Sequence, residues 1–199
     1  MEWSVIIAMA VYSFVLAVTP GPNNTALLAL GGRFGFRATI PYLTGMAVGL
    51  IVLVGVMALG LGALLEIYPV GFMALKYVAF AFVLYLAWRT LGVGKGGRGR
   101  EADKPITIWQ SSVFQLVNPK AWIATGTLIA AYVPEGTRVW GFVIAAVTFV
   151  LATLPGAMIW AFAGQAVSYL LSGSRAHRIF SIVMALALVA TMVPVLLMG

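Results

Sequence analysis

The chain is dominated by apolar runs that are longer than the core helices of a soluble protein. Six such runs occupy residues 5–32, 38–65, 70–91, 106–132, 139–171 and 179–198. A helix needs about 20 apolar residues to cross a hydrocarbon core about 30 Å thick, and every run reaches that length. A membrane β-barrel would instead alternate apolar and polar residues over segments of about ten, a pattern that this sequence lacks. The pattern therefore predicts an all-α integral membrane protein with six transmembrane helices.

One long hydrophilic stretch divides the chain nearly in half. Residues 92–104 read GVGKGGRGREADK. A segment this rich in glycine and charged residues is typical of a flexible connector. We therefore expect a first three-helix repeat at residues 1–92, a linker at residues 93–105 and a second three-helix repeat at residues 106–199. Because each half holds an odd number of spans, the halves would enter the membrane from opposite sides, as inverted repeats do in transporters.

The positive charge gathers on one side of the predicted spans. The loops that join spans one and two, three and four, and five and six hold nine of the 12 lysines and arginines. Cytoplasmic loops retain such residues, so we expect the linker in the cytoplasm and both termini on the outer side of the membrane. This orientation accounts for the net charge of +7 without a nucleic-acid partner. A five-span arrangement would disturb the alternation, and it ranks second.

Two of the predicted spans, the first and the fourth, are interrupted by proline near the membrane middle. A proline inside a helix removes an N–H group and clashes with the preceding turn, and the freed carbonyls must face protein or a water-filled cavity. Interrupted helices at corresponding places of two repeats are typical of a transporter's substrate site. A shift of 99 residues brings the two interruptions into register. The expected substrate-binding residues are Thr19, Pro20, Gly21, Pro22, Asn23, Asn24, Gln115, Asn118, Pro119 and Lys120.

Lys120 is a cation within a predicted span. A lysine at the centre of a membrane helix costs about 2.5 to 3.5 kcal/mol on insertion scales, so one that is kept there usually serves a site. A zwitterion suits such a site, because its carboxylate can meet Lys120 or a helix N-terminus while its ammonium meets carbonyls freed by the prolines. Two alternatives stay open: the prolines are only structural kinks, or Lys120 extends to the membrane interface along its aliphatic stem.

These motifs resemble the lysine exporter (LysE/RhtB) family over nearly the whole chain. The resemblance is carried by TPGPNN at 19–24, the basic turn at 33–37, GMAVG at 45–49, Tyr85 within 76–88, and NPKA at 118–121. It implies a secondary transporter in a bacterial-type inner (plasma) membrane. Such a protein exports amino acids or related small metabolites from the bacterial cytoplasm, driven by the membrane potential or a proton gradient. Where many relatives carry an acidic residue this chain has Leu50, which leaves no carboxylate inside a predicted span. Neutral amino acids are therefore favoured over cationic ones.

Several further residues are predicted to serve helix packing or gating. Gly45 and Gly49 present a small-residue face at four-residue spacing, which lets helices approach closely within the chain or, as an alternative, in a homodimer. The resemblance adds Tyr85 to this group. Pro155, with Thr153 before it and Trp160 after it, is a hinge, a cavity wall or a structural kink.

Composition narrows the classes of function. The chain is 62% hydrophobic and 9% charged, contains no cysteine and has a single histidine, His177, between two arginines. An enzyme, a heavy-metal exporter or a dithiol electron carrier would need nucleophiles or metal ligands that the spans do not contain, so we expect no catalytic residue, cofactor or metal. The expected partners are an amino acid substrate and the lipid bilayer. The alternative to a carrier is a non-transporting membrane subunit or scaffold.

Overall fold

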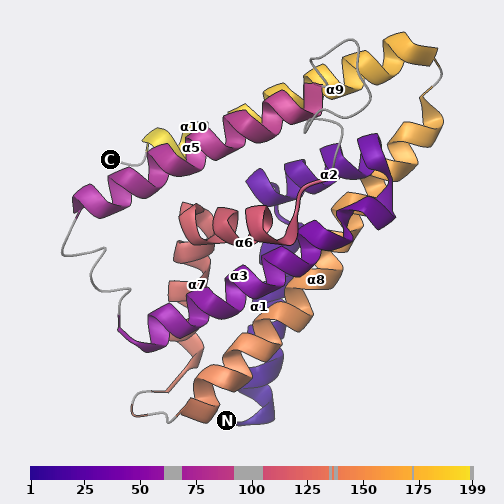
Figure 1. The fold of residues 1–199 in the computed structure, drawn as a ribbon. Helices are drawn as coiled ribbons and strands as arrows, with labels where there is room; N and C mark the ends of the chain where they lie inside the picture. The colour runs from indigo at the N-terminus through magenta and orange to yellow at the C-terminus, as the bar shows by residue number, and fades with distance from the viewer. Residues whose placement is uncertain (61–68, 92–104, 135, 137–138, 172, 198–199) are drawn as a thin grey trace.

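The described part of the protein is helical throughout (Figure 1). The structure is a computed structural model, and it describes residues 1–199 apart from 61–68, 92–104, 135, 137–138, 172 and 198–199. Its elements are α1 (Trp3–Val18), α2 (Pro22–Phe34), the 3-10 helix η1 (Phe36–Thr39), α3 (Ile40–Ala58), α5 (Pro69–Leu91), α6 (Ile108–Val117), α7 (Pro119–Tyr132), α8 (Val139–Leu170), α9 (Gly173–Ala190) and α10 (Val193–Leu197). The prediction of an all-α fold is confirmed.

The first and fourth apolar runs each form two helices instead of one. α1 and α2 meet at an angle of 59° across residues 19–21. α6 ends at Val117 and α7 begins at Pro119, so that Asn118 alone separates them. Both breaks lie at prolines because proline is well tolerated in the first turn of a helix but not in the middle of one.

The number of membrane crossings is only partly supported by helix length and composition. Three described helices, over residues 36–58, 73–91 and 139–170, are long and apolar enough to cross a membrane, and the bent pair α1 and α2 makes a fourth. α6 and α7 have 10 and 14 residues, which is short for a crossing by either helix alone. The arrangement of six spans in two inverted repeats therefore stays a prediction.

Two predicted spans have different ends in the structure. The second, predicted at 38–65, is helical from Phe36 to Ala58 and then turns at Gly60, whose φ of 75° is in the left-handed region that favours glycine. Residues 61–65 lie outside the described part of the chain. The last, predicted at 179–198, begins at Gly173 because the polar Ser-Arg-Ala-His-Arg segment is also helical, and it is interrupted between α9 and α10. The linker at residues 93–105 lies almost wholly outside the described residues.

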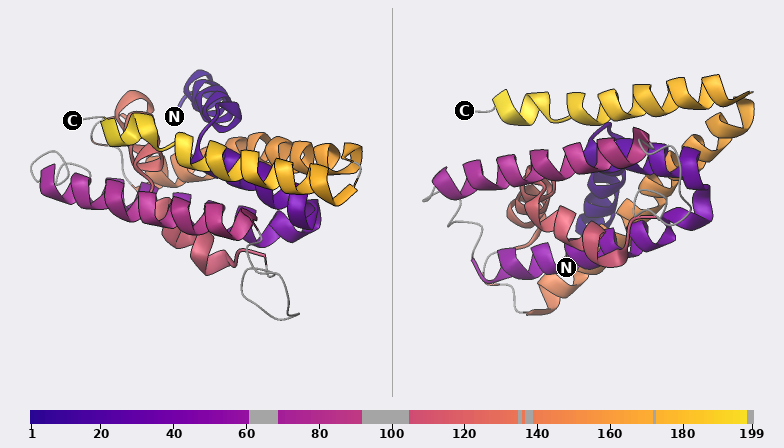
Figure 2. Two further views of the ribbon diagram at one scale, coloured as in Figure 1. Left: turned by 90° about the horizontal axis from the view of Figure 1, so that it is seen from above. Right: turned by 45° about the horizontal axis from the view of Figure 1, so that its top comes forward.

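α8, with 32 residues, is the central element of the helix packing. It packs against α1, α2 and α3, while α3 also packs against α6. α5 and α9 run side by side along one side of the molecule (Figure 2). Helices of the first half therefore pack mainly against helices of the second half, and the site described below lies between them.

Glycines allow the backbones of these helices to touch. A Cβ atom added to Gly164 of α8 would overlap the carbonyl oxygen of Leu28 in α2, and one added to Gly31 of α2 would overlap the carbonyl oxygen of Ala161. Gly45 and Gly49 of α3 lie in the same way against α6, where a Cβ at Gly49 would be 2.5 Å from Cβ of Gln115. The small-residue face of α3 is thus covered by α6 of the same chain.

Candidate functional site

The break between α1 and α2 is held together by polar side chains of the motif itself. Asn24 is buried, and its amide nitrogen donates to the carbonyl oxygens of Ala17 (2.6 Å) and Thr19 (2.7 Å). The Thr19 hydroxyl donates to the carbonyl of Val15 at 2.7 Å. These bonds satisfy carbonyls at the end of α1 that a continuing helix would otherwise satisfy. The Asn24 amide therefore stabilises the break, and its predicted part in substrate binding stays a prediction.

The break between α6 and α7 is held in a similar way. The side-chain oxygen of Asn118 accepts from the backbone N–H of Lys120 at 3.1 Å, which caps the first turn of α7. Pro119 follows as the first helical residue, where its missing N–H leaves no partner unpaired. The indole N–H of Trp122 donates to the carbonyl of Leu116 at 2.6 Å, across the break.

Lys120 joins the two breaks. Its ammonium nitrogen lies 3.2 Å from the carbonyl oxygens of both Thr19 and Pro20, at the C-terminal end of α1, where the helix dipole favours a cation. Gly21 leaves room for this side chain, because a Cβ there would be 2.8 Å from the ammonium nitrogen. The φ of 178° at Gly21 is extended backbone that any residue adopts, so the glycine is needed for space only.

A chain of hydrogen bonds connects the first break to α3 and α6. The hydroxyl of Tyr42 donates to the side-chain oxygen of Asn23 at 2.7 Å, and the Asn23 amide donates to the side-chain oxygen of Gln115 at 2.8 Å. Tyr42 is 0% and Gln115 1% exposed, while Asn23 between them is partly exposed. Hydrogen-bond networks of this kind fix side-chain orientations. The Asn23 side chain is therefore held in one position at the start of α2.

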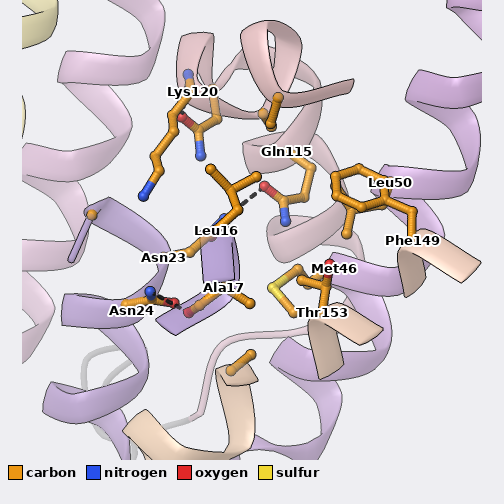
Figure 3. Close-up of a pocket in the computed structure, with 15 residues that line it drawn as sticks. Leu16, Ala17, Asn23, Asn24, Met46, Leu50, Gln115, Lys120, Phe149 and Thr153 are labelled. Atoms are coloured by element: carbon orange, nitrogen blue, oxygen red, sulfur yellow. Dashed lines mark hydrogen bonds between the residues drawn. The ribbon is translucent and has the colours of Figure 1, made fainter. Parts of the chain in front are cut away.

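These elements enclose a pocket with a volume of about 60 Å³, drawn in Figure 3. The volume has room for a few water molecules, because each water has a share of about 30 Å³ in the liquid. The pocket is lined from both halves of the chain by Leu16, Ala17, Gly21, Asn23, Asn24, Met46, Leu50, Gln115, Asn118, Lys120, Ala121, Ala124, Phe149, Thr153 and Ala157.

Six of the ten predicted binding residues line this pocket: Gly21, Asn23, Asn24, Gln115, Asn118 and Lys120. The other four, Thr19, Pro20, Pro22 and Pro119, belong to the two breaks but do not line it. Sequence reasoning missed Tyr42 and the apolar lining residues. Tyr42 could have been found, because a tyrosine in an apolar helix needs a hydrogen-bond partner for its hydroxyl. The apolar lining residues carry no signal that separates them from the rest of the core.

The residues predicted for packing or gating lie outside the pocket lining. The hydroxyl of Tyr85 accepts from Arg89 and from Gln110, each at 3.1 Å, and so connects α5 to α6. Pro155 is exposed within α8 and does not end that helix, and Trp160 is half-buried against the core. Within the described residues, no three His, Asp or Glu side chains come together as metal ligands would.

Comparison with known proteins identifies the family. The sequence profile of the LysE type translocators matches residues 14–199. The chain is similar to the cysteine/O-acetylserine efflux proteins of Klebsiella pneumoniae and of Escherichia coli K12. The first is 31% identical over 81% of this chain and 83% of the relative, and the second 31% identical over 89% and 90%. The protein of the same name from Salmonella typhimurium is 32% identical over 77% of this chain and 79% of its own length.

No solved structure matches the chain at a significant level. The profile nevertheless covers both breaks and every helix from the end of α1 onward. This match to a family of translocators confirms the prediction that the protein is a transport protein and not an enzyme. The chain therefore belongs to the LysE type translocator family, as the resemblance of its two proline motifs indicated.

Proposed function

We propose that this protein is a secondary transporter that exports small neutral amino acids, or related small metabolites, from the cytoplasm through the pocket between its two helix breaks. The observation that carries the proposal is the position of Lys120, whose ammonium group reaches from the second break to two carbonyls of the first. Polar, interrupted helices that meet in a pocket serve a carrier, whereas a scaffold needs only packed helices.

The ends of the half-helices offer both charges of an amino acid a partner. α2 begins at Pro22 and α7 at Pro119, and residues next to both starts line the pocket. A helix N-terminus carries about half a positive charge, so these two ends together with Lys120 attract a carboxylate. The carbonyls of Thr19 and Pro20, which bind the Lys120 ammonium in this structure, are suited to a substrate ammonium.

This arrangement suggests an exchange of partners during binding. As the substrate carboxylate draws the Lys120 ammonium toward itself, the substrate ammonium takes over the carbonyls of Thr19 and Pro20. Because one cation replaces another on the same carbonyls, the break keeps its hydrogen bonds throughout. The pocket of about 60 Å³ holds a few water molecules but not an amino acid. The substrate therefore enters when the two halves of the protein move apart.

The preference for neutral substrates follows from the charges near the pocket. Its lining contains one cation, Lys120, and no acidic residue. A lysine or arginine substrate would bring a second cation without a counter-charge into a site of low dielectric, which is unfavourable. The relatives from Klebsiella pneumoniae and Escherichia coli are named for efflux of cysteine and O-acetylserine, both small and neutral, which supports the same class here.

For the membrane arrangement we propose six spans in two inverted repeats, with the linker at residues 93–105 in the cytoplasm and both termini outside. In this arrangement the pair α1 and α2 corresponds to α6 and α7, α3 to α8, and α5 to α9. The equal position of the two breaks in their halves supports the repeat, and the basic loops support the orientation.

Export from sealed vesicles tests the proposal. Proteoliposomes loaded with radiolabelled L-serine, O-acetyl-L-serine or L-lysine are diluted into unlabelled buffer, with and without an imposed membrane potential. We expect release of the two neutral compounds well above that of protein-free liposomes, and little release of lysine. Equal leakage with and without protein across a broad panel of amino acids would leave the scaffold alternative in place of the carrier.

A further inference from the structure

A fully buried polar atom of the pocket lacks a partner among the described residues. Thr153, in α8, lines the pocket, and its hydroxyl oxygen is buried without a hydrogen bond to any described residue. Each of the other polar side chains discussed at the two breaks makes at least one hydrogen bond, to another side chain, to a backbone carbonyl or to a backbone N–H group. A buried polar group without a partner is uncommon in native proteins and needs an explanation.

Other hydroxyls in this protein show the usual way to avoid such a state. A serine or threonine in a helix can donate to the carbonyl four residues earlier in its own helix. Within the described residues, this bond is made by Ser13, Thr19, Thr25, Thr90, Ser112 and Thr125. Thr153 does not make it with Phe149, the residue four positions earlier. Its hydroxyl therefore has no partner within the described part of this structure, and a substrate could bond it once the pocket widens.

Stability alone does not account for a threonine at this position. Valine has the same shape with a methyl group in place of the hydroxyl, and a buried hydroxyl without a partner lowers the stability of the fold. A valine would therefore be at least as stable at residue 153. A substrate polar atom that reaches the hydroxyl as the pocket widens would supply the hydrogen bond that is missing in this structure.

The place of Thr153 in the pocket indicates which part of a substrate it meets. Thr153 lies beside Met46 and Phe149, on the side of the pocket opposite Lys120 (Figure 3). An amino acid with its carboxylate toward Lys120 would therefore direct its side chain to this apolar end. Because Met46 and Phe149 are apolar, the Thr153 hydroxyl is the polar group beside them that can bond a polar substituent.

We infer that Thr153 is a specificity-determining residue, whose hydroxyl forms a hydrogen bond with a polar atom on the side chain of a small neutral substrate. The inference rests on the proposed function and narrows its substrate class to amino acids with a polar side-chain atom near the α-carbon. Amino acids of the same size with a purely apolar side chain fit the pocket less well, because they leave this hydroxyl unpaired.

Two substrates and two variants test the inference. L-Serine has a hydroxyl where L-2-aminobutyrate has a methyl group. The substitution Thr153→Val makes the matching change in the protein, because it replaces the hydroxyl of residue 153 by a methyl group. We expect Thr153→Val to lower the preference for serine over 2-aminobutyrate, measured as the ratio of their export efficiencies from proteoliposomes, by about 3- to 10-fold. Thr153→Ser keeps the hydroxyl and should keep most of the preference. Thr153→Val should also unfold at a temperature no lower than the wild-type protein.

The other results would overturn the inference. An unchanged ratio in Thr153→Val, an equal loss of export for both substrates, or a lower unfolding temperature would each assign the hydroxyl a structural role. If Thr153→Val does not fold, the hydroxyl serves the fold and the inference is equally overturned. If the wild-type protein exports both amino acids and Thr153→Val exports them in the same ratio, only this inference is contradicted. Wild-type protein that exports neither contradicts the proposed function, and this inference with it.

Discussion

Replacement of Lys120 by methionine is expected to lower the rate of amino acid export at least about tenfold while the protein still folds and inserts. Methionine keeps an apolar stem but removes the ammonium, which in the proposed exchange leaves the carbonyls of Thr19 and Pro20 to bond the substrate carboxylate. Hydrogen bonds that involve a charged group contribute about 1.5 to 3 kcal/mol each, and about 1.4 kcal/mol corresponds to a factor of ten. The rate is measured as the initial efflux of labelled L-serine from proteoliposomes, relative to the amount of inserted protein.

A matched control separates this effect from a general loss of charge. Arg175 is exposed at the start of α9 and does not line the pocket. Arg175→Met should therefore transport serine at the wild-type rate. Equal rates for Lys120→Met and the wild-type protein would show that the ammonium group has no part in transport, and that Lys120 only stabilises the breaks.

The substitution Gly164→Ala is expected to prevent the protein from folding in the membrane. The added methyl group would overlap the carbonyl oxygen of Leu28, and the amide nitrogen of Gly32 also lies close. Both are backbone atoms of α2, so the overlap is relieved only if α2 and α8 separate. Overpacking lowers stability by about 1 to 3 kcal/mol even where flexible side chains can move aside. Backbone atoms within a helix move less easily, so the loss of stability here is expected to be larger. We expect little detergent-extracted, monodisperse protein.

Gly55→Ala is the control for this prediction. Gly55 lies within α3, and a Cβ added there would meet no atom within 4 Å. Alanine is favoured over glycine in a helix by about 1 kcal/mol, so Gly55→Ala should give at least the wild-type yield. Similar yields for Gly164→Ala and Gly55→Ala would contradict the close contact between α2 and α8.

The positions of the two helix breaks could be predicted from the sequence because proline acts locally. Pro20, Pro22 and Pro119 each lack an N–H group, and this fact does not depend on the surrounding fold. The role of an individual polar side chain is harder to predict. Asn24 and Asn23 are adjacent amides in the same motif, yet Asn24 bonds to the backbone of its own break while Asn23 bonds to Tyr42 and Gln115.

The rest of the pocket was hidden because it depends on how distant helices pack. Met46, Leu50 and Phe149 line the pocket, but each is one apolar residue among many in a helix with little polar contrast between its faces. Helix ends were uncertain for a related reason. Ser-Arg-Ala-His-Arg is too polar to count as part of an apolar run, yet a polar segment extends a helix readily when its side chains are exposed.

The central claim is that the two helix breaks meet around one pocket, and paired cysteines test it directly. The chain contains no cysteine of its own, so the two introduced thiols are the only ones in the protein. Asn23 and Gln115 form a hydrogen bond of 2.8 Å between the two halves, whereas Ile123 is exposed on α7. Asn23→Cys can therefore be paired with Gln115→Cys as the test and with Ile123→Cys as the control, each with a protease site in the linker.

After treatment of membranes with a short thiol-specific cross-linker and cleavage of the linker, the account predicts that the halves of the Asn23→Cys/Gln115→Cys protein stay joined. The halves of the Asn23→Cys/Ile123→Cys protein should separate. Separation of the halves in the first protein, or equal cross-linking in both, would contradict the meeting of the two breaks and with it the proposed transport site.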